Sequence, residues 1–282
     1  MKRFKKSALG LFFALIALIA VWGWQTLNLF LNQDGLLYHP DAAWQTTPAD
    51  SGLDYEDVTF VSADGLRLSA WWVKAPDARG TVLLCHGNAG NISHRLDETH
   101  VYQSLGFNVL VFDYRGYGKS QGKPSEAGTY ADAEAAWRYL VEERRVLPSD
   151  IVLCGRSLGA AIAVKLAADH RPRALVIESG FTSLADLASE LYPWFPVRQL
   201  LKFRYETLNA LKEVRSPVLL VHSRQDKLVP FHHGQTLYAA ARPPKKFLEI
   251  SGPHNEGYQL SEDIYRQGLK DFLYSPAPSS EN

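Results

Sequence analysis

The chain has 282 residues, of which 46% are hydrophobic and 21% are charged, a balance typical of a globular protein and not of a disordered one. This length suits one large domain or two small ones and allows a sizeable core. The 30 basic residues equal the 30 acidic ones, so no excess of positive charge favours nucleic acid as a partner. Two cysteines are too few for a disulfide framework.

The N-terminal segment combines a basic cluster with a long apolar stretch. Four basic residues stand within the first six: Lys2, Arg3, Lys5 and Lys6. They leave 26 basic against 30 acidic residues in the rest of the chain, a net charge of −4. No ionisable residue occurs between Ser7 and Gln33, and a helix of about 20 apolar residues spans the hydrocarbon core of a bilayer. Trp22 and Trp24 fall where aromatic side chains meet a membrane interface.

We interpret residues 1–33 as an uncleaved signal-anchor. A cleaved signal peptide is the main alternative, but it needs small residues one and three positions before the cut, and Ala17 and Ala20 do not have that spacing. A buried core helix is the third reading, which the apolar character of every face argues against. The basic flank predicts a cytoplasmic N-terminus. The rest of the chain would then lie on the non-cytoplasmic side, in a periplasm, outside the cell or in a lumen.

The body of the chain contains short apolar runs separated by helical patterns. Six runs have the continuous apolar character of strands buried on both faces: Thr81–Cys85, Phe107–Phe112, Ile151–Cys154, Ala174–Ile177, Pro217–Val221 and Lys246–Ile250. Helical patterns at 131–147 and 158–168 lie between them. This alternation predicts a mostly parallel sheet that is covered by helices on both sides.

The remaining parts of the chain define its predicted organisation. Ala63-Asp64-Gly65 predicts a hairpin between strands at 55–62 and 66–74. Residues 34–54 form a connector, residues 55–274 one α/β domain, and residues 275–282 a flexible polar tail with prolines. No internal repeat and no boundary to a second domain is visible.

A candidate nucleophile stands directly after one of the predicted strands. Gly155-Arg156-Ser157-Leu158-Gly159 follows the run that ends at Cys154 and opens the helical pattern at 158. A G-x-S-x-G motif between strand and helix places the serine on a sharp, strained turn. The two glycines fit because larger residues on either side of that turn would collide. We therefore predict that Ser157 is a catalytic nucleophile; a glycine-rich strand end with an idle serine is the alternative.

A serine hydroxyl needs a base and an acid that orients this base, in the chain order serine, acid, histidine. His254 follows the last predicted strand, where a loop can return over the serine, and Asp226 follows the strand before it. We predict that His254 is the base and Asp226 the acid. The other downstream histidines lie at a helix end, a strand end and the start of a surface helix: His170, His222, His232 and His233. Asp186 and Glu206 fall in predicted helices and are weaker candidates for the acid.

An oxyanion needs two hydrogen-bond donors. The backbone N–H of the residue after the nucleophile, Leu158, supplies one of them. The loop 86–91, His-Gly-Asn-Ala-Gly-Asn, supplies the second, and we predict the N–H of Asn88, with Ala89 as the next choice. Asn91 is better placed to cap the following helix.

Together these motifs carry a family resemblance. The set resembles the α/β-hydrolase superfamily and is most similar to the membrane-anchored hydrolases related to the bud-emergence proteins. The matching pieces extend from residue 36 to 260: Leu36–Pro40, His86–Asn91, Asp113–Ser120, Gly155–Gly159, Glu178–Ser183, Asp226 with Val229-Pro230, and Gly252–Asn255. The resemblance implies an eight-stranded sheet, a Ser157–Asp226–His254 triad and an esterase, thioesterase or lipase-like activity. Some relatives remove fatty acyl groups from proteins. One departure is Ser223 after His222, where many relatives have glycine.

Other signals do not support a cofactor or a metal. Gly118-Lys119-Ser120 looks like the end of a phosphate-binding loop, but Asp113 stands where that loop needs a glycine. We find no H-E-x-x-H motif and no cysteine–histidine cluster at zinc spacing. Cys85 and Cys154 end strands that the family fold makes neighbours, and adjacent parallel strands suit a disulfide badly, so we predict buried thiols.

The segment 184–215 is long enough for only a small lid of one or two helices. It is rich in large apolar residues, which suit either an acyl-chain site above Ser157 or ordinary packing on the sheet.

We predict a membrane-anchored serine hydrolase for carboxylic esters or thioesters of small or lipid-like acyl substrates, acylated proteins included. Acyl transfer to another acceptor, peptidase activity and a non-catalytic, membrane-tethered binding protein on the same fold are the alternatives.

Overall fold

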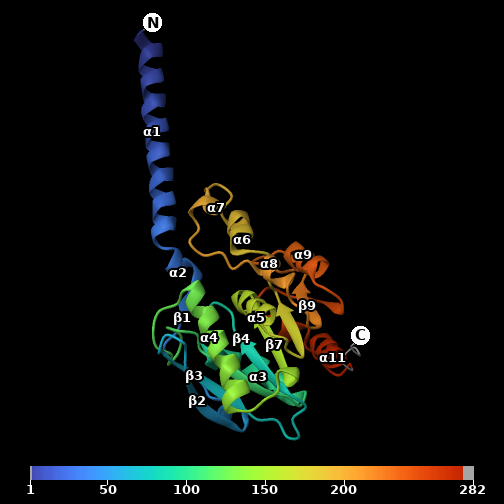
Figure 1. The fold of residues 1–282 in the computed structure, drawn as a ribbon. Helices are drawn as coiled ribbons and strands as arrows, with labels where there is room; N and C mark the ends of the chain where they lie inside the picture. Colours follow the sequence, from blue (N-terminus) through green and yellow to red (C-terminus); the bar gives the residue numbers. More distant parts are fainter. Residues whose placement is uncertain (1, 276–282) are drawn as a thin grey trace.

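The computed structural model describes residues 2–275, and residues 276–282 of the predicted tail lie outside it (Figure 1). An eight-stranded sheet has the order β10-β9-β8-β7-β4-β6-β3-β2. Its strands are β2 (Tyr55–Val61), β3 (Arg67–Val73), β4 (Thr81–Cys85), β6 (Asn108–Phe112), β7 (Ile151–Arg156), β8 (Ala174–Glu178), β9 (Val218–Ser223) and β10 (Lys245–Ile250). The strands from β10 to β6 are parallel, and only β3 runs against its neighbours. The predicted hairpin, the six predicted strands and the mostly parallel sheet are therefore confirmed.

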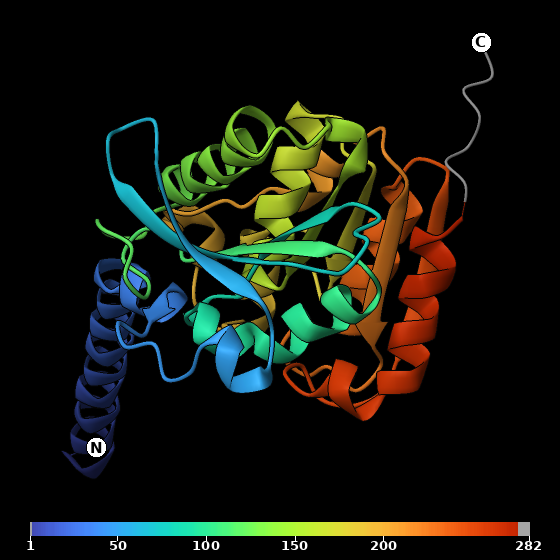
Figure 2. The ribbon, with the colours of Figure 1, turned by 90° about the horizontal axis from the view of Figure 1, so that it is seen from below.

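Helices cover both faces of this sheet, as the view from below shows (Figure 2). One face packs on α4 (Glu126–Arg138), α5 (Leu158–Asp169), α8 (Thr207–Leu211) and α9 (Phe231–Ala240), and the other on α3 (Leu96–Ser104) and α11 (Glu262–Leu273). Successive residues of β4 alternate between the two cores: Leu83 and Cys85 join one, Val82 and Leu84 the other. All four are buried, which explains the continuous apolar run in the sequence.

The helix predicted at 131–147 differs from the observed one. α4 begins earlier, because the Ser125 side chain caps it by accepting a hydrogen bond from the backbone N–H of Gly128 at 3.1 Å. Beyond Arg138 the chain makes one wider helical turn, Tyr139–Glu143. Leu147 lies outside the helix and is exposed, because the following Pro148 disfavours helical backbone at the residue before it. The second prediction, 158–168, matches α5 to within one residue.

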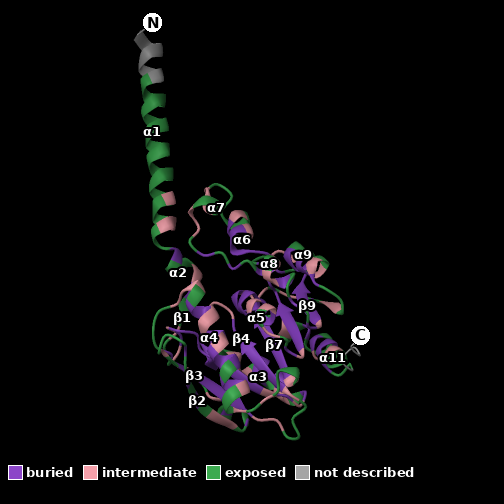
Figure 3. Ribbon diagram, viewed as in Figure 1, coloured by how far each residue is buried: buried purple, intermediate pink, exposed green. Residues whose placement is uncertain are grey.

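The N-terminal helix α1 (Lys2–Leu31) extends away from the domain (Figure 1). Its segment Leu9–Leu31 is apolar, and its 23 residues correspond to about 34 Å at 1.5 Å per residue. Most of this segment is exposed, in contrast to the buried sheet, whereas Thr26, Leu29 and Phe30 at the domain end are half-buried (Figure 3). The helix is thus long and apolar enough to cross a bilayer, and a signal sequence would meet the same criterion.

The connector is folded onto the domain. It contains α2 (Gln33–Leu37), the short strand β1 (His39–Pro40) and a 3₁₀ turn (Pro48–Ser51). β1 pairs in parallel with β5 (Ala89–Gly90), which lies in the predicted oxyanion loop. The connector therefore braces a loop of the candidate site.

The predicted lid segment lies between β8 and β9. It contains α6 (Leu184–Leu191), α7 (Val197–Leu200) and α8. α6 and α7 rise above the domain on the side of α1, whereas α8 packs against α5 (Figure 1). The lid is small, as its length predicts.

Candidate active site

Ser157 occupies the tight turn between β7 and α5. Its backbone has φ 53° and ψ −116°, a strained conformation for a residue with a side chain. The flanking glycines are a steric requirement of this turn. A Cβ on Gly155 would lie 2.2 Å from the carbonyl oxygen of Gly159, and one on Gly159 would lie 2.0 Å from that of Cys85. The predicted elbow is present, and it holds Ser157 at the carboxyl end of the sheet.

Asp226 and His254 are joined by a hydrogen bond. His254 Nδ1 lies 2.6 Å from Asp226 Oδ2. The other oxygen, Oδ1, accepts hydrogen bonds from the backbone N–H groups of Leu228 at 2.9 Å and Val229 at 2.8 Å. The two N–H groups thus hold Oδ1 and leave Oδ2 facing His254 Nδ1, with the buried His222 Nε2 at 3.6 Å from the same oxygen.

These contacts also set the charge of the acid. Burial alone would raise the pKa of Asp226, but the hydrogen bond and charge of His254, together with the N–H of Val229, outweigh it and lower the pKa. Asp226 therefore stays ionised, and its charge favours the His254 tautomer that carries hydrogen on Nδ1. That tautomer leaves a lone pair on Nε2, as a general base requires.

Ser157 and His254 line the same cavity. Among the hydrogen bonds of the described residues, none joins Ser157 Oγ to His254. Such contacts are often long without a substrate and tighten in the complex.

The predicted oxyanion donors lie at the same cavity. The backbone N–H groups of Leu158 and Asn88 take part in no hydrogen bond within the described chain. Other atoms of Asn88 fix the loop: its side-chain Nδ2 donates to Leu37 O at 2.8 Å, and its backbone oxygen accepts from His39 N at 3.0 Å and Tyr117 Oη at 2.7 Å. Asn91 caps the following turn, as predicted, by accepting from the N–H of Ser93.

A buried ion pair supports the histidine loop, and sequence reasoning did not identify it. Arg156 forms a salt bridge with Glu98 of α3, and both side chains are buried. The same guanidinium donates to the backbone oxygens of His254 at 2.8 Å and Asn255 at 2.6 Å. Burial would lower the pKa of Arg156, but Glu98 and Glu178 raise it, so the cation persists. Arg156 thus ties the elbow to the loop that carries His254.

Glu178 supports the elbow, a role that its place in the matched segment Glu178–Ser183 did not reveal. Its backbone oxygen accepts from the N–H of Ser157 at 2.9 Å. Its buried carboxyl accepts hydrogen bonds from Tyr265 and, at 3.3 Å, from Tyr102. Burial and the nearby Glu98 carboxylate raise the pKa of Glu178 to about 7.

Ser223, the departure from the family pattern, connects the acid loop to the histidine loop. Its hydroxyl donates to Gly252 O at 2.5 Å and accepts from the N–H of Gln225 at 3.1 Å. The side-chain oxygen of Gln225 accepts from the N–H of Gly252. A side chain at position 223 therefore holds the two loops together.

A cavity of about 460 Å³ opens at Ser157. Apolar side chains of the lid line it, among them Leu187, Leu191 and Phe195. Residues of the N-terminal segment line it as well, which the sequence did not predict: Thr26, Leu29, Phe30, Gln33, Leu36 and Leu37. Among the described residues of its lining, none is an aspartate or a glutamate. The site thus suits a mostly apolar ligand.

Comparison with known proteins finds relatives over most of the chain. The chain is 38% identical over 273 residues to the α/β-hydrolase domain-containing protein WAV2 of Arabidopsis thaliana, covering 87% of this chain and 89% of that one. It is 33% identical to protein bem46 of Schizosaccharomyces pombe, covering 80% and 79%. The chain belongs to the α/β-hydrolase family. Residues 76–197 of the hydrolase match a family profile described as serine aminopeptidase, S33.

Solved structures share the fold of the hydrolase. The Pyrococcus furiosus esterase Pf2001 aligns with a TM-score of 0.72 and 24% identity, covering 84% of this chain and 98% of that one. At this identity the likeness concerns the fold alone. The predicted α/β-hydrolase fold and the predicted relation to the bud-emergence proteins are both confirmed.

The other histidines and acidic residues that the sequence offered for the triad make different contacts. His222 is buried, and its Nε2 lies 2.9 Å from Val229 O, so it orders the turn that carries Asp226. His170 contacts Glu134 at 2.8 Å and stacks on Trp137. Asp186 binds Thr182 and Arg198 inside the lid region, and Glu206 contacts Asn209. None of these four candidates lines the cavity at Ser157 in the described chain.

Glu190, His232 and His233 form a cluster whose metal-binding atoms lie within 4.8 Å of one another. His233 is buried, so the prediction that it lies near the surface is wrong, whereas His232 is exposed. His233 Nδ1 accepts the backbone N–H of Thr182 at 3.2 Å, which places the ring hydrogen on Nε2, 3.4 Å from Glu190. Burial lowers the pKa of His233 and keeps it neutral. A nitrogen that carries hydrogen cannot bind a metal, so this cluster suits a contact between α6 and α9.

Cys85 and Cys154 are free, buried thiols, as predicted.

Proposed function

We propose that the hydrolase is a membrane-anchored serine hydrolase that cleaves carboxylic esters or thioesters through Ser157, His254 and Asp226. The observation that carries the proposal is the hydrogen-bonded Asp226–His254 pair beside a serine on a strained elbow, in one apolar cavity. Family membership supports hydrolysis in general. The assignment of the three side chains rests on their geometry.

The proposed first half-reaction forms an acyl-enzyme. With Nδ1–H bonded to Asp226, His254 Nε2 takes the proton of Ser157 Oγ as the oxygen attacks the carbonyl carbon of the substrate. The carbonyl oxygen becomes an oxyanion, which the N–H groups of Leu158 and Asn88 stabilise by about 3 kcal/mol each. His254 then gives the proton to the departing alcohol or thiol, and the bond between carbon and leaving group breaks.

The second half-reaction returns the free enzyme. Water replaces the leaving group, and His254 Nε2 takes one of its protons while the oxygen attacks the acyl carbon. The collapse of this second tetrahedral intermediate breaks the bond to Ser157 Oγ and returns the proton to it. The products are a carboxylic acid and the regenerated serine.

The lining of the cavity favours an acyl ester over a peptide with a free amino terminus. An aminopeptidase needs an acidic group for the substrate ammonium, and the described lining holds no such group. Leu187, Leu191 and Phe195 instead offer apolar surface to an acyl chain. Hydrolysis with added alcohol or amine acceptors distinguishes this reaction from acyl transfer, because a transferase forms the acceptor's ester or amide in place of free acid.

Labelling with a fluorophosphonate probe tests the nucleophile. We expect the wild type and the Ser251→Ala variant, which changes an exposed serine beside the histidine loop, to be labelled at equal rates. We expect the folded Ser157→Ala variant to remain unlabelled. A folded wild type that resists the probe would instead favour a non-catalytic binding protein.

We also propose that residues 1–33 remain as an anchor, with the N-terminus in the cytoplasm and the catalytic domain on the other side. The length and apolar character of Leu9–Leu31 support this proposal. We expect the full-length chain to sediment with membranes and to be released only by detergent. A shortened, soluble mature chain would contradict the anchor.

A further inference from the structure

The last turns of α1 form a wall of the cavity that contains Ser157. Thr26, Leu29 and Phe30 of α1 line this wall, together with Gln33, the first residue of α2. Spacings of three and four residues place them on one face of a helix. The catalytic cavity is therefore closed on one side by the same segment that is long enough to cross a bilayer.

Contacts at two positions, Trp22 and Gln33, hold the lid against this helical face. Trp22 Nε1 donates to Trp194 O at 2.9 Å, and the Trp22 and Phe195 rings stack with an interplanar angle of 4°. Further along, the buried amide of Gln33 donates to Leu200 O at 2.9 Å and accepts from Lys202 N at 2.7 Å. At the helical rise, the eleven residues from Trp22 to Gln33 cover about 16 Å of chain. The three lining positions of α1 and Gln33 of α2 fall within this interval, so the helices and the lid form two sides of the cavity, and we call this part of the cavity the channel.

The contact at Trp22 sets the position of the lid relative to a bilayer that α1 would span. A span needs about 20 residues without charge, and these must lie between Ser7 and Gln33. Every 20-residue window in that interval contains Trp22. When α1 spans the bilayer, the lid tip that contacts Trp22 therefore lies at the depth of the membrane and not in bulk water.

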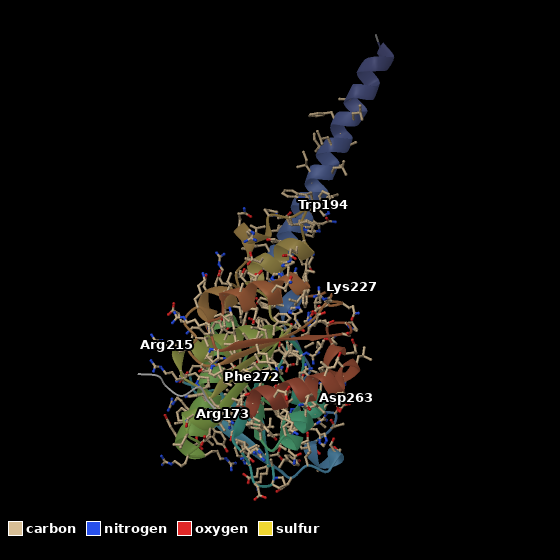
Figure 4. All side chains as sticks on the ribbon, turned by 90° about the vertical axis from the view of Figure 1, so that its right-hand side faces the viewer. Arg173, Trp194, Arg215, Lys227, Asp263 and Phe272 are labelled. Carbon is tan, nitrogen blue, oxygen red and sulfur yellow. The ribbon has the colours of Figure 1, made fainter. Side chains whose placement is uncertain are left out.

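The lid tip, residues 191–195, has side chains that suit a membrane interface. Trp194 is 83% exposed, and Leu191 and Tyr192 are also exposed. Figure 4 shows Trp194 at the end of the domain from which α1 emerges. Exposed tryptophan, tyrosine and leucine are unfavourable in water but common at a membrane interface.

We propose that the acyl chain of the substrate enters from the bilayer, through the channel between α1 and the lid, and that the substrate is a long-chain ester or thioester resident in the membrane. This inference rests on the proposed function, because it takes Ser157 as the nucleophile at the inner end of the channel. The occupant is a lipid acyl chain. The span continues directly into the wall of the cavity, and the described lining holds apolar side chains without a carboxylate.

A channel-filling substitution tests the route of entry. The full-length hydrolase is reconstituted in phosphatidylcholine vesicles and assayed with two esters of 4-methylumbelliferone, the water-soluble butyrate and the bilayer-resident palmitate. In the Leu29→Trp variant a larger ring enters the channel, whereas in the matched Leu27→Trp variant it lies on the exposed part of α1. We expect Leu29→Trp to lower the ratio of palmitate to butyrate kcat/KM by about tenfold or more, as expected when about two methylenes of the chain lose their burial. Leu27→Trp should leave that ratio unchanged, and equal ratios in the two variants would overturn the inference.

A depth measurement tests the position of the lid without using activity. Cys85 and Cys154 are buried, so a thiol-reactive fluorophore selects the position changed in Trp194→Cys. We expect lipids with brominated acyl chains to quench this fluorophore. They should not quench one attached in the Leu147→Cys variant, because this exposed residue precedes β7 and so lies at the opposite end of the parallel strands from Ser157 and the lid. Equal quenching at both positions would place the lid tip in water and overturn the inference.

The two proposals fail in different ways. If Ser157→Ala hydrolyses both esters as fast as the wild type, the proposed function fails. If activity on both esters depends on Ser157 while Leu29→Trp and Leu27→Trp have the same chain preference, only the bilayer route fails.

Discussion

Replacement of Asp226 by asparagine tests the mechanism with little change of shape. Asparagine keeps one oxygen, which can still accept from the N–H groups of Leu228 and Val229. Its NH₂ group then faces His254 Nδ1, where the wild type has a carboxylate oxygen at 2.6 Å. Two donors cannot share this contact, so the imidazole turns to the tautomer with hydrogen on Nε2. In that tautomer Nε2 cannot take the proton of Ser157.

The expected loss in kcat is large. The same change in a serine–histidine–aspartate triad on an unrelated fold lowers kcat by about 10⁴, which corresponds to about 5.4 kcal/mol of activation free energy. The free energy of unfolding should fall by no more than about 2 kcal/mol, because the two backbone hydrogen bonds remain. The pKa of Asp226 is lowered in the folded protein, so its contribution to stability is present above the ordinary carboxyl pKa. It is lost as the pH falls through the lowered pKa, and the stability of the two proteins should then converge.

The assay measures kcat on a water-soluble short-chain ester together with denaturant unfolding across this acidic range. Asp186→Asn is the matched control, because Asp186 bonds to Thr182 and Arg198 away from the cavity at Ser157. A stable Asp226→Asn variant that retains activity within about tenfold of the wild type would refute the tautomer argument.

Three further predictions concern the support of the elbow. Gly159→Ala places a Cβ 2.0 Å from a backbone oxygen and should lower the free energy of unfolding by about 3 kcal/mol or more, whereas Gly87→Ala, with its nearest atom at 3.7 Å, should change it by less than about 1 kcal/mol. Equal melting temperatures would show that the elbow can relax. Glu98→Gln leaves the buried Arg156 guanidinium without its carboxylate, so the free energy of unfolding should drop by about 3–5 kcal/mol. The kcat should fall as well, because Arg156 holds the backbone of His254. An unchanged melting temperature and kcat would show that the ion pair does not support the site. Because the pKa of Glu178 is raised to about 7, wild-type stability should decline as the pH rises from about 4.5 through 7, and Glu178→Gln should flatten this decline in pH-dependent unfolding. A parallel decline in both proteins would count against this assignment.

The parts of the site that were predictable are encoded locally. Ser157 lies in a five-residue motif, and His254 and Asp226 each follow a recognisable strand, so chain order and strand ends suffice to propose them. The strands were predictable for a similar reason, because burial on both faces produces continuous apolar runs. The asparagine loop was recognisable from its glycines and its place after β4.

The supporting contacts depend on distant parts of the chain. Arg156 meets Glu98 across 58 positions, and Trp22 meets Trp194 across 172. Neither pair has a sequence pattern, because each arises only when the sheet brings separate helices and loops together. The start of α4 was missed for a local reason: the Ser125 cap lies in a polar stretch that precedes the apolar periodicity. The burial of His233 depends on the packing of α9 against the residues after β8, which the sequence does not reveal.

The central claim is that Ser157 carries the acyl group of the substrate. Its most direct test is rapid quenching of the full-length hydrolase with a long-chain acyl thioester, followed by intact-protein and peptide mass spectrometry. We predict a mass increase of one acyl group on the peptide that contains Ser157, slowed by Asp226→Asn and absent from Ser157→Ala. Hydrolysis without any acylated peptide, or an acyl group on another residue, would contradict the account.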